Sequence, residues 1–131
     1  MQVQVISAGK SQEVIKTYKD LFVWQKSVEL AIMVYKITSG FPKNQQYGLV
    51  SQIERAAVSI ASNIAEGAGR KGSKEFVQYI SIAKGSLYEL ETQFIISNRV
   101  GFISQENLDY LVIKIEEIGR MLNGLKRSLE N

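Results

Sequence analysis

The 131-residue sequence contains neither cysteine nor histidine. Disulfides, thiolate nucleophiles and the usual zinc sites are therefore excluded, because they depend on these two residue types. The commonest general base at neutral pH is missing as well, and the Glu-x-x-His motif of di-iron bundles cannot occur. We expect no metal, no cofactor and no small-molecule substrate.

Proline is almost absent, and long apolar runs are missing. Pro42 is the single proline, and no stretch approaches the roughly 18 consecutive apolar residues of a membrane span. The first residues also lack the basic and apolar segments of a secretory signal. We therefore expect a single-domain, cytoplasmic protein that does not contact membranes. Ala, Leu, Ile, Glu and Lys dominate from Asp20 onward, which favours an all-α fold.

The excess of positive charge is small. The chain holds 16 Lys and Arg against 13 Asp and Glu, which gives a formal net charge of +3. Such a composition permits contact with nucleic acid without requiring it, because a basic patch on one face matters more than the total charge. Charge alone therefore leaves the class of partner open.

Residues 1–17 differ in pattern from the rest of the chain. Val3 and Val5 alternate with polar residues, which is a weak strand signal, and Gly9 interrupts the alternation. We interpret this segment as a flexible N-terminal arm; the alternative is a strand that pairs with a neighbouring subunit. Residues 18–131 are expected to form the folded domain.

Four segments carry apolar residues at the spacing of an amphipathic helix. The predicted helices are one that starts at the N-cap Asp20 and stops within 38–42, a second from 44–46 to Gly67, a third from the N-cap Ser73 to 98–99, and a fourth after the N-cap Ser104. Short connections between these segments predict an up-down-up-down antiparallel four-helix bundle.

The first predicted helix is apolar on more than one side, so we expect it to be buried on more than one side. One set of residues recurs at steps of three and four, and a second set lies on a different side of the helix. The first set is Leu21, Trp24, Val28, Ala31 and Tyr35, and the second is Leu30, Val34 and Ile37.

The stretch 52–67 combines many small residues with a polar stripe at helical spacing. The stripe consists of Gln52, Arg55, Ser59, Asn63 and Glu66. Small residues allow another helix to approach closely, and polar residues on a packed helix need partners. The same helix has more apolar surface than one bundle core requires, and Val50, Val58, Ala61 and Ala65 contribute to the surplus. A central helix in a monomer would explain this, but we favour a surplus that faces another subunit, with the stripe fastening helices or subunits together.

The connection 67–74 is rich in glycine and basic. Its glycines match the dinucleotide fingerprint G-x-G-x-x-G, but that fingerprint follows a strand, whereas a helix is expected here, so we reject it. Arg70, Lys71 and Lys74, together with the first N–H groups of the next helix, would suit a phosphate. A solvated turn between two helices would explain the same residues equally well.

Two sequence blocks resemble a known family. They are 59–67 (Ser-Ile-x-x-Asn-Ile-Ala-Glu-Gly) and 83–92 (Ala-x-Gly-Ser-Leu-x-Glu-Leu-Glu-Thr), and they resemble the four-helix bundle family of 23S rRNA-intervening-sequence proteins. The resemblance covers about 18–129 and excludes the arm. It implies a bacterial four-helix bundle that assembles into a ring-like homopentamer. It also implies a relation to the accessory variability proteins of diversity-generating retroelements, a group of basic pentamers associated with nucleic-acid binding.

The leading hypothesis is a non-enzymatic homo-oligomer that binds RNA or other nucleic acid. Its contacts would be Arg70, Lys71 and Lys74, with Lys126 and Arg127 and also Lys43 if the fold brings these side chains together. The alternative is a protein-interaction scaffold whose bundle builds a homo-oligomer without nucleic acid.

An enzyme is the third hypothesis. Its residues would be Glu66, Glu89, Glu91, Arg55 and Lys84, arranged as a buried carboxylate site. We favour a structural polar network for these residues, because buried charges need partners and such networks can fix the register between helices. No nucleophile with a neighbouring base is recognisable.

Overall fold

The computed structural model describes residues 4–7, 10–14 and 17–131. In chain order its elements are β1 (Gln4–Ser7), β2 (Lys10–Val14), a 3-10 helix (Tyr18–Asp20), α1 (Phe22–Thr38), a second 3-10 helix (Lys43–Gln45), α2 (Leu49–Ala68), α3 (Ser73–Arg99) and α4 (Gln105–Glu130). β1 and β2 pair as an antiparallel hairpin, with Gln4 opposite Val14. This hairpin falls within the predicted N-terminal arm, whose Val3 and Gly9 lie outside the described residues.

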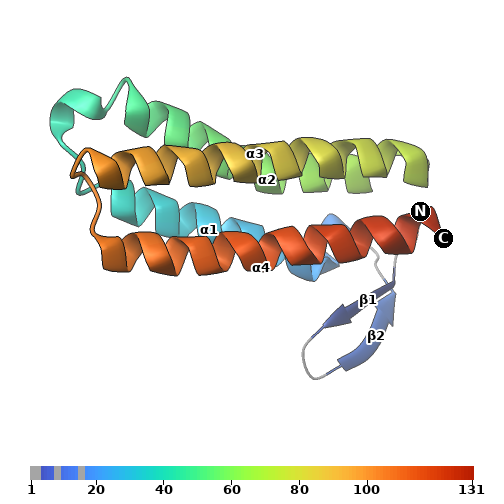
Figure 1. Ribbon diagram of the computed structural model, residues 1–131. Helices are drawn as coiled ribbons and strands as arrows, with labels where there is room; N and C mark the ends of the chain where they lie inside the picture. Colours follow the sequence, from blue (N-terminus) through green and yellow to red (C-terminus); the bar gives the residue numbers. More distant parts are fainter. Residues whose placement is uncertain (1–3, 8–9, 15–16) are drawn as a thin grey trace.

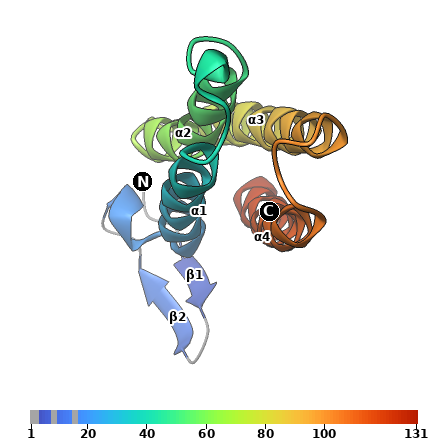
Figure 2. The same cartoon turned by 90° about the vertical axis from the view of Figure 1, so that its left-hand side faces the viewer.

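In the described part of the chain, four α-helices run alternately up and down (Figure 1). Seen end-on they take the four corners of a bundle, with α1 and α3 at diagonal corners (Figure 2). Each helix packs against its neighbour in the sequence, and α1 also contacts α4. The predicted up-down-up-down antiparallel bundle is confirmed.

The topology divides the connections between two ends of the bundle (Figure 1). The α2–α3 connection lies at the same end as the start of α1 and the end of α4. The α1–α2 and α3–α4 connections lie at the opposite end. Lys43 therefore does not converge with Arg70, whereas the last turns of α4 do share its end of the bundle.

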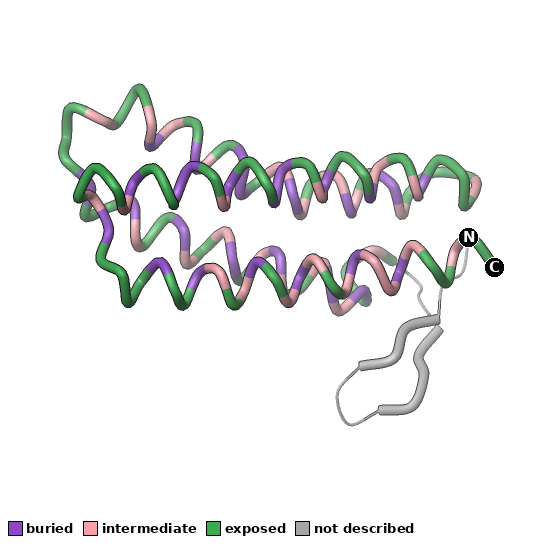
Figure 3. The backbone as a smooth tube through the Cα atoms, viewed as in Figure 1, coloured by how far each residue is buried: buried purple, intermediate pink, exposed green. Residues whose placement is uncertain are grey.

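The core is apolar, and buried positions recur along each helix at helical spacing (Figure 3). On α3 the buried apolar residues recur at helical spacing, from Phe76 through Leu87 to Phe94. On α2 the same holds for Ile53, Ile60 and their neighbours. In the described part of the chain, none of the helices combines the length and the apolar character needed to cross a membrane.

α1 uses its two apolar sets differently from each other. Leu30 and Val34 from the second set are buried in the core, together with Leu21. In the first set, Trp24 stays half-buried and Tyr35 is exposed. The first set is therefore covered only in part within a single chain: Leu21 is buried and Trp24 and Ala31 pack against the core, whereas Tyr35 stays exposed.

Two predicted N-caps are wrong, and one is confirmed. The N-cap of α1 is Leu21, which makes no side-chain capping hydrogen bond, and not the predicted Asp20. Asp20 instead ends the preceding 3-10 helix, where it accepts a hydrogen bond from the Thr17 N–H at 3.2 Å and completes a capping box with Thr17. Gly72 is the N-cap of α3, and Ser73 is its first helical residue. Ser104 caps α4 as predicted, because its hydroxyl accepts from the Asn107 N–H at 3.1 Å.

Candidate functional site

The polar stripe of α2 lies along its contact with α3. The Ser59 and Ser86 hydroxyls are 2.9 Å apart and join the two helices. Asn63 Nδ2 donates to the Ser59 hydroxyl at 2.9 Å and to the Ser59 carbonyl at 2.8 Å. Since all three side chains are half-buried or buried, these hydrogen bonds satisfy groups that burial would otherwise destabilise. We call this line of contacts, continued by Glu66, Arg70 and Tyr79, the α2/α3 seam.

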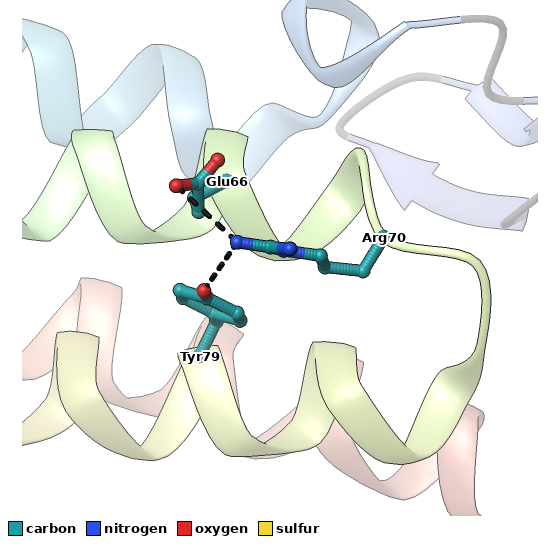
Figure 4. Close-up of polar contacts among 3 residues, drawn as sticks. All are labelled: Glu66, Arg70 and Tyr79. Carbon is teal, nitrogen blue, oxygen red and sulfur yellow. Dashed lines mark hydrogen bonds and ion pairs between the residues drawn. The ribbon is translucent and has the colours of Figure 1, made fainter.

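Arg70 closes the seam at the end of the bundle (Figure 4). Its Nη2 donates to the Tyr79 hydroxyl at 2.7 Å and lies 3.5 Å from a Glu66 carboxylate oxygen. Its guanidinium carbon is 5.1 Å from the centre of the Tyr79 ring, within the range of a cation–π contact. Arg70 therefore bridges the α2–α3 connection to α3, and part of its charge is offset by Glu66.

Only part of the polar stripe predicted on α2 lies in the α2/α3 seam. Gln52 and Arg55 are exposed, and Arg55 Nη2 reaches only the Ser51 hydroxyl, at 3.4 Å on its own helix. Ser59, Asn63 and Glu66 are thus the members of the predicted stripe that the seam brings together.

Two segments that carry positively charged side chains lie at the same end of the bundle. Lys71 and Lys74 are exposed on the α2–α3 connection and the first turn of α3. Lys126 is half-buried and Arg127 is exposed in the last turns of α4, at the same end (Figure 1). We call these four residues the basic end.

A groove of about 570 Å³ joins the two segments of the basic end. The start of α3 and the end of α4 form its walls, and the acidic Glu130 lies among the lining residues beside Lys74. The lining residues are Ser73, Lys74, Val77, Gln78, Leu129 and Glu130. The two segments therefore border one groove, and Lys74 is the member of the basic end that lines it.

A second groove of about 570 Å³ lies between α1 and α2, and it is mainly apolar. Small residues of α2 face large residues of α1 across it, and Ile32 and Tyr35 are 53% and 47% exposed. Its lining residues are Tyr18, Trp24, Val28, Ala31, Ile32, Tyr35, Lys36, Val58, Ala61, Ser62 and Ala65. We call it the α1/α2 groove. It contains the first apolar set of α1 except Leu21, and the apolar surplus of α2 except Val50; these two residues are buried in the core.

The family model of 23S rRNA-intervening sequence proteins matches residues 19–124. The chain belongs to this family. The matched range includes the whole α2/α3 seam and the lysines of the α2–α3 connection. It ends before Lys126 and Arg127, so the two cations of α4 lie outside the matched range.

Solved structures share the fold of this 23S rRNA-intervening sequence protein. One of them is a protein of unknown function from the S23 ribosomal protein family of Bacteroides thetaiotaomicron, with a TM-score of 0.76 and 24% sequence identity. The alignment covers 83% of this chain and 98% of that chain. Comparison with curated proteins gives no match.

The sequence analysis did not predict the residues that α3 contributes to the α2/α3 seam. Tyr79 accepts from Arg70 of the α2–α3 connection, Ser86 bonds Ser59 of α2, and Gln93 continues their line at steps of seven. Gln93 is buried: its Nε2 donates to Glu89 at 3.3 Å, and its Oε1 has no hydrogen-bond partner among the described residues. The heptad spacing of these polar residues is a signal that could have revealed the seam.

The residues of the enzyme hypothesis do not form a buried carboxylate site. Glu66 and Glu89 are exposed, and Glu91 is half-buried. In the part of the chain that the structure describes, no group of three or more acidic side chains is placed to hold a metal ion.

Tyr79→Phe should destabilise the family member by about 1 kcal/mol, because it removes the hydroxyl that accepts from Arg70 and leaves the ring in place. Urea unfolding at a fixed protein concentration measures the change. Tyr110→Phe is the matched control: Tyr110 is exposed on α4, and no hydrogen bond to its hydroxyl is seen among the described residues. Equal effects of the two changes would show that the Arg70–Tyr79 bond does not stabilise the fold.

Proposed function

We propose that this 23S rRNA-intervening sequence protein is a non-enzymatic homo-oligomer that binds RNA or other nucleic acid through its basic end. The observation that carries the proposal is that two distant segments with exposed cations lie at the same end of the bundle. Lys71 and Lys74 come from the α2–α3 connection, and Lys126 and Arg127 come from the end of α4. Phosphate backbones are bound largely by such clusters of Lys and Arg.

The side chains predicted to contact nucleic acid differ in how available they are to a phosphate. Arg70 already donates to Tyr79 and pairs with Glu66, so its guanidinium is less available to a phosphate than the exposed ammonium groups of Lys71 and Lys74. Lys43 lies at the opposite end of the bundle (Figure 1). The proposal therefore rests on the lysines of the α2–α3 connection and the cations of α4.

Self-association of the chain would strengthen the binding of nucleic acid by the basic end. One chain has a formal net charge of +3, and Glu75 and Glu130 lie near the lysines of the basic end. Several copies that face one nucleic acid would multiply the number of phosphate contacts, and each contact adds to both the affinity and its salt dependence. The proposed function therefore joins the basic end to self-association.

Charge reversal at the basic end should weaken binding strongly. In Lys71→Glu with Lys74→Glu we expect the affinity for a labelled single-stranded RNA to fall roughly 10- to 100-fold at about 50 mM salt. We also expect the slope of log affinity against log salt to fall by about 2, because two phosphate contacts are lost. Fluorescence anisotropy over a series of salt concentrations measures both quantities.

The matched control reverses two charges outside the basic end, in Lys43→Glu with Arg120→Glu, both of which are exposed. It changes the net charge by the same amount and should reduce the affinity far less. Absence of binding by the unchanged protein at low salt would contradict the proposal. Equal losses in the two variants would show that total charge, and not the basic end, determines binding.

A second candidate function is a self-assembling scaffold that binds no nucleic acid. The α1/α2 groove favours it, because an exposed apolar groove of this kind marks an interaction surface. Light scattering together with the ratio of absorbance at 260 and 280 nm separates the candidates. An oligomer that carries no nucleic acid, and that binds none when it is added at low salt, would support the scaffold.

A further inference from the structure

The bundle carries a second unpartnered apolar surface, on α3. Its large side chains are exposed on the side of the helix opposite the core, and Ile82 and Tyr88 are 51% and 60% exposed. Gly85, which has no side chain, and the small Thr92 lie between the large residues. Glu89 and Arg99 lie on the same exposed face of α3. We call Ile82, Gly85, Tyr88, Thr92, Ile95, Ile96 and Val100 the α3 stripe.

The α3 stripe follows one face of one helix. At 100° per residue its members span an arc of roughly 140°, centred opposite the buried residues Phe76, Leu87 and Phe94. From Ile82 to Val100 it is about 27 Å long, at 1.5 Å per residue. It is therefore a convex apolar ridge about five helical turns in length.

The α1/α2 groove has the opposite shape. Ala61 and Ala65 of α2 keep its floor low, and Trp24 and Tyr35 stand on its α1 side. From Trp24 to Tyr35 it extends over about three helical turns. A single helix with small residues among its large ones can lie in such a groove, because ridges of side chains pack into grooves between them.

The two surfaces lie on different sides of the molecule. The groove lies between α1 and α2, whereas α3 is diagonal to α1 (Figure 2). One chain cannot bring its own ridge into its own groove. Two grooves facing each other would leave their concave floors unfilled, so a symmetric groove-to-groove dimer is disfavoured.

We infer that the α3 stripe of one copy of this chain occupies the α1/α2 groove of the next copy. The inference rests on the self-association in the proposed function and specifies its interface. Such a contact is heterologous, because it joins two different surfaces. Each added copy leaves one groove and one stripe free, and assembly continues until a ring closes.

Two variants that each block one surface test this arrangement. Ile32→Glu with Val58→Glu blocks the groove, and Ile82→Glu with Tyr88→Glu blocks the stripe. All four side chains are more than 40% exposed, so the fold should be retained, and circular dichroism checks this. Ile113→Glu is the control, since Ile113 is exposed on α4 outside both surfaces. We expect light scattering to give an oligomer for the unchanged protein and the control, and the 14.7 kDa mass of one chain for each blocked variant.

Mixing the two blocked variants gives the decisive result. The groove-blocked chain keeps its stripe, and the stripe-blocked chain keeps its groove, so an equimolar mixture should form a 1:1 pair of twice the single-chain mass and grow no further. A stripe-blocked variant that still associates, or a mixture that stays monomeric, would overturn the heterologous contact. A monomeric unchanged protein would instead overturn the proposed self-association itself. Nucleic-acid binding is a separate measurement that none of these masses decides.

Discussion

Gly67→Ala is expected to lower the free energy of unfolding by about 2 kcal/mol, although alanine is a better helix former than glycine. Gly67 is buried in the last turn of α2, where α3 passes closest. A Cβ at this position would lie 2.7 Å from the Cβ of Tyr79 and 2.9 Å from Cδ1 of Phe76. The Tyr79 Cβ is attached to the backbone and cannot turn away, so α2 and α3 would have to separate.

Gly119→Ala is the matched control for this prediction. Gly119 lies within α4, and no described atom outside its own helical surroundings lies within 4 Å of a Cβ placed there. The same substitution should therefore stabilise the protein by roughly 0.5–1 kcal/mol. Urea unfolding of both variants at one protein concentration measures the difference. If Gly67→Ala also stabilised the protein, close approach of the helices would not be the role of Gly67.

The small residue at position 67 also matters for the proposed nucleic-acid surface. Gly67 precedes the connection that carries Arg70 and Lys71, and Arg70 reaches Tyr79 across the gap that Gly67 keeps narrow. Separation of the helices would loosen this bond and the connection with it. Gly67→Ala should therefore weaken binding to nucleic acid as well, without a change in charge.

Local pattern was sufficient to predict the helices and most of the core. The spacing of apolar residues on α2 and α3 identifies the buried sides, because a helix with one wide apolar face has one way to bury it. Ser104 was predicted correctly as an N-cap because no competing residue precedes it. Asp20 was not, because it is the partner of Thr17 in the capping box of a short 3-10 helix, and α1 begins only after Leu21.

The orientation of α1 could not be predicted from its own residues. Its two apolar sets are similar in hydrophobicity, and only the positions of the other helices decide that Leu30 faces the core and Tyr35 faces outward. The side of α1 left exposed is the same surface that forms the α1/α2 groove. Sequence reasoning detected a surplus of apolar surface but could not place it.

The α2/α3 seam shows the same limit for polar residues. Ser59 and Asn63 stand out in the sequence because they interrupt an apolar helix at regular steps. Their partner Ser86 is 27 positions away from Ser59, and the antiparallel register that joins them is a tertiary property. For the same reason Arg70 was assigned to phosphate binding alone, since nothing local places the Tyr79 hydroxyl beside it.

Phe76→Ala is expected to be the most destabilising of the substitutions considered, at about 3–5 kcal/mol. Phe76 has no exposed surface, and it lies in the first turn of α3, where its ring fills the space beside Gly67. Removing the ring leaves a cavity that the packed helices can close only in part. Phe102→Ala is a suitable comparison: its ring is half-buried near Phe41 at the other end of the bundle, so the loss should be smaller. Similar losses at both positions would contradict the placement of Phe76 in the core.

The pair Gly67 and Phe76 then tests whether their contact is the origin of both effects. In the double variant Gly67→Ala with Phe76→Ala, the clash with Cδ1 of Phe76 is gone, while the clash with the Tyr79 Cβ remains. The combined loss should therefore be smaller than the sum of the single losses by about 1 kcal/mol, because residues in contact are not additive. Additive losses within about 0.3 kcal/mol would show that α2 and α3 respond to the two changes independently. The expected deviation, in contrast, would show that the contact between Gly67 and Phe76 couples the end of α2 to the start of α3.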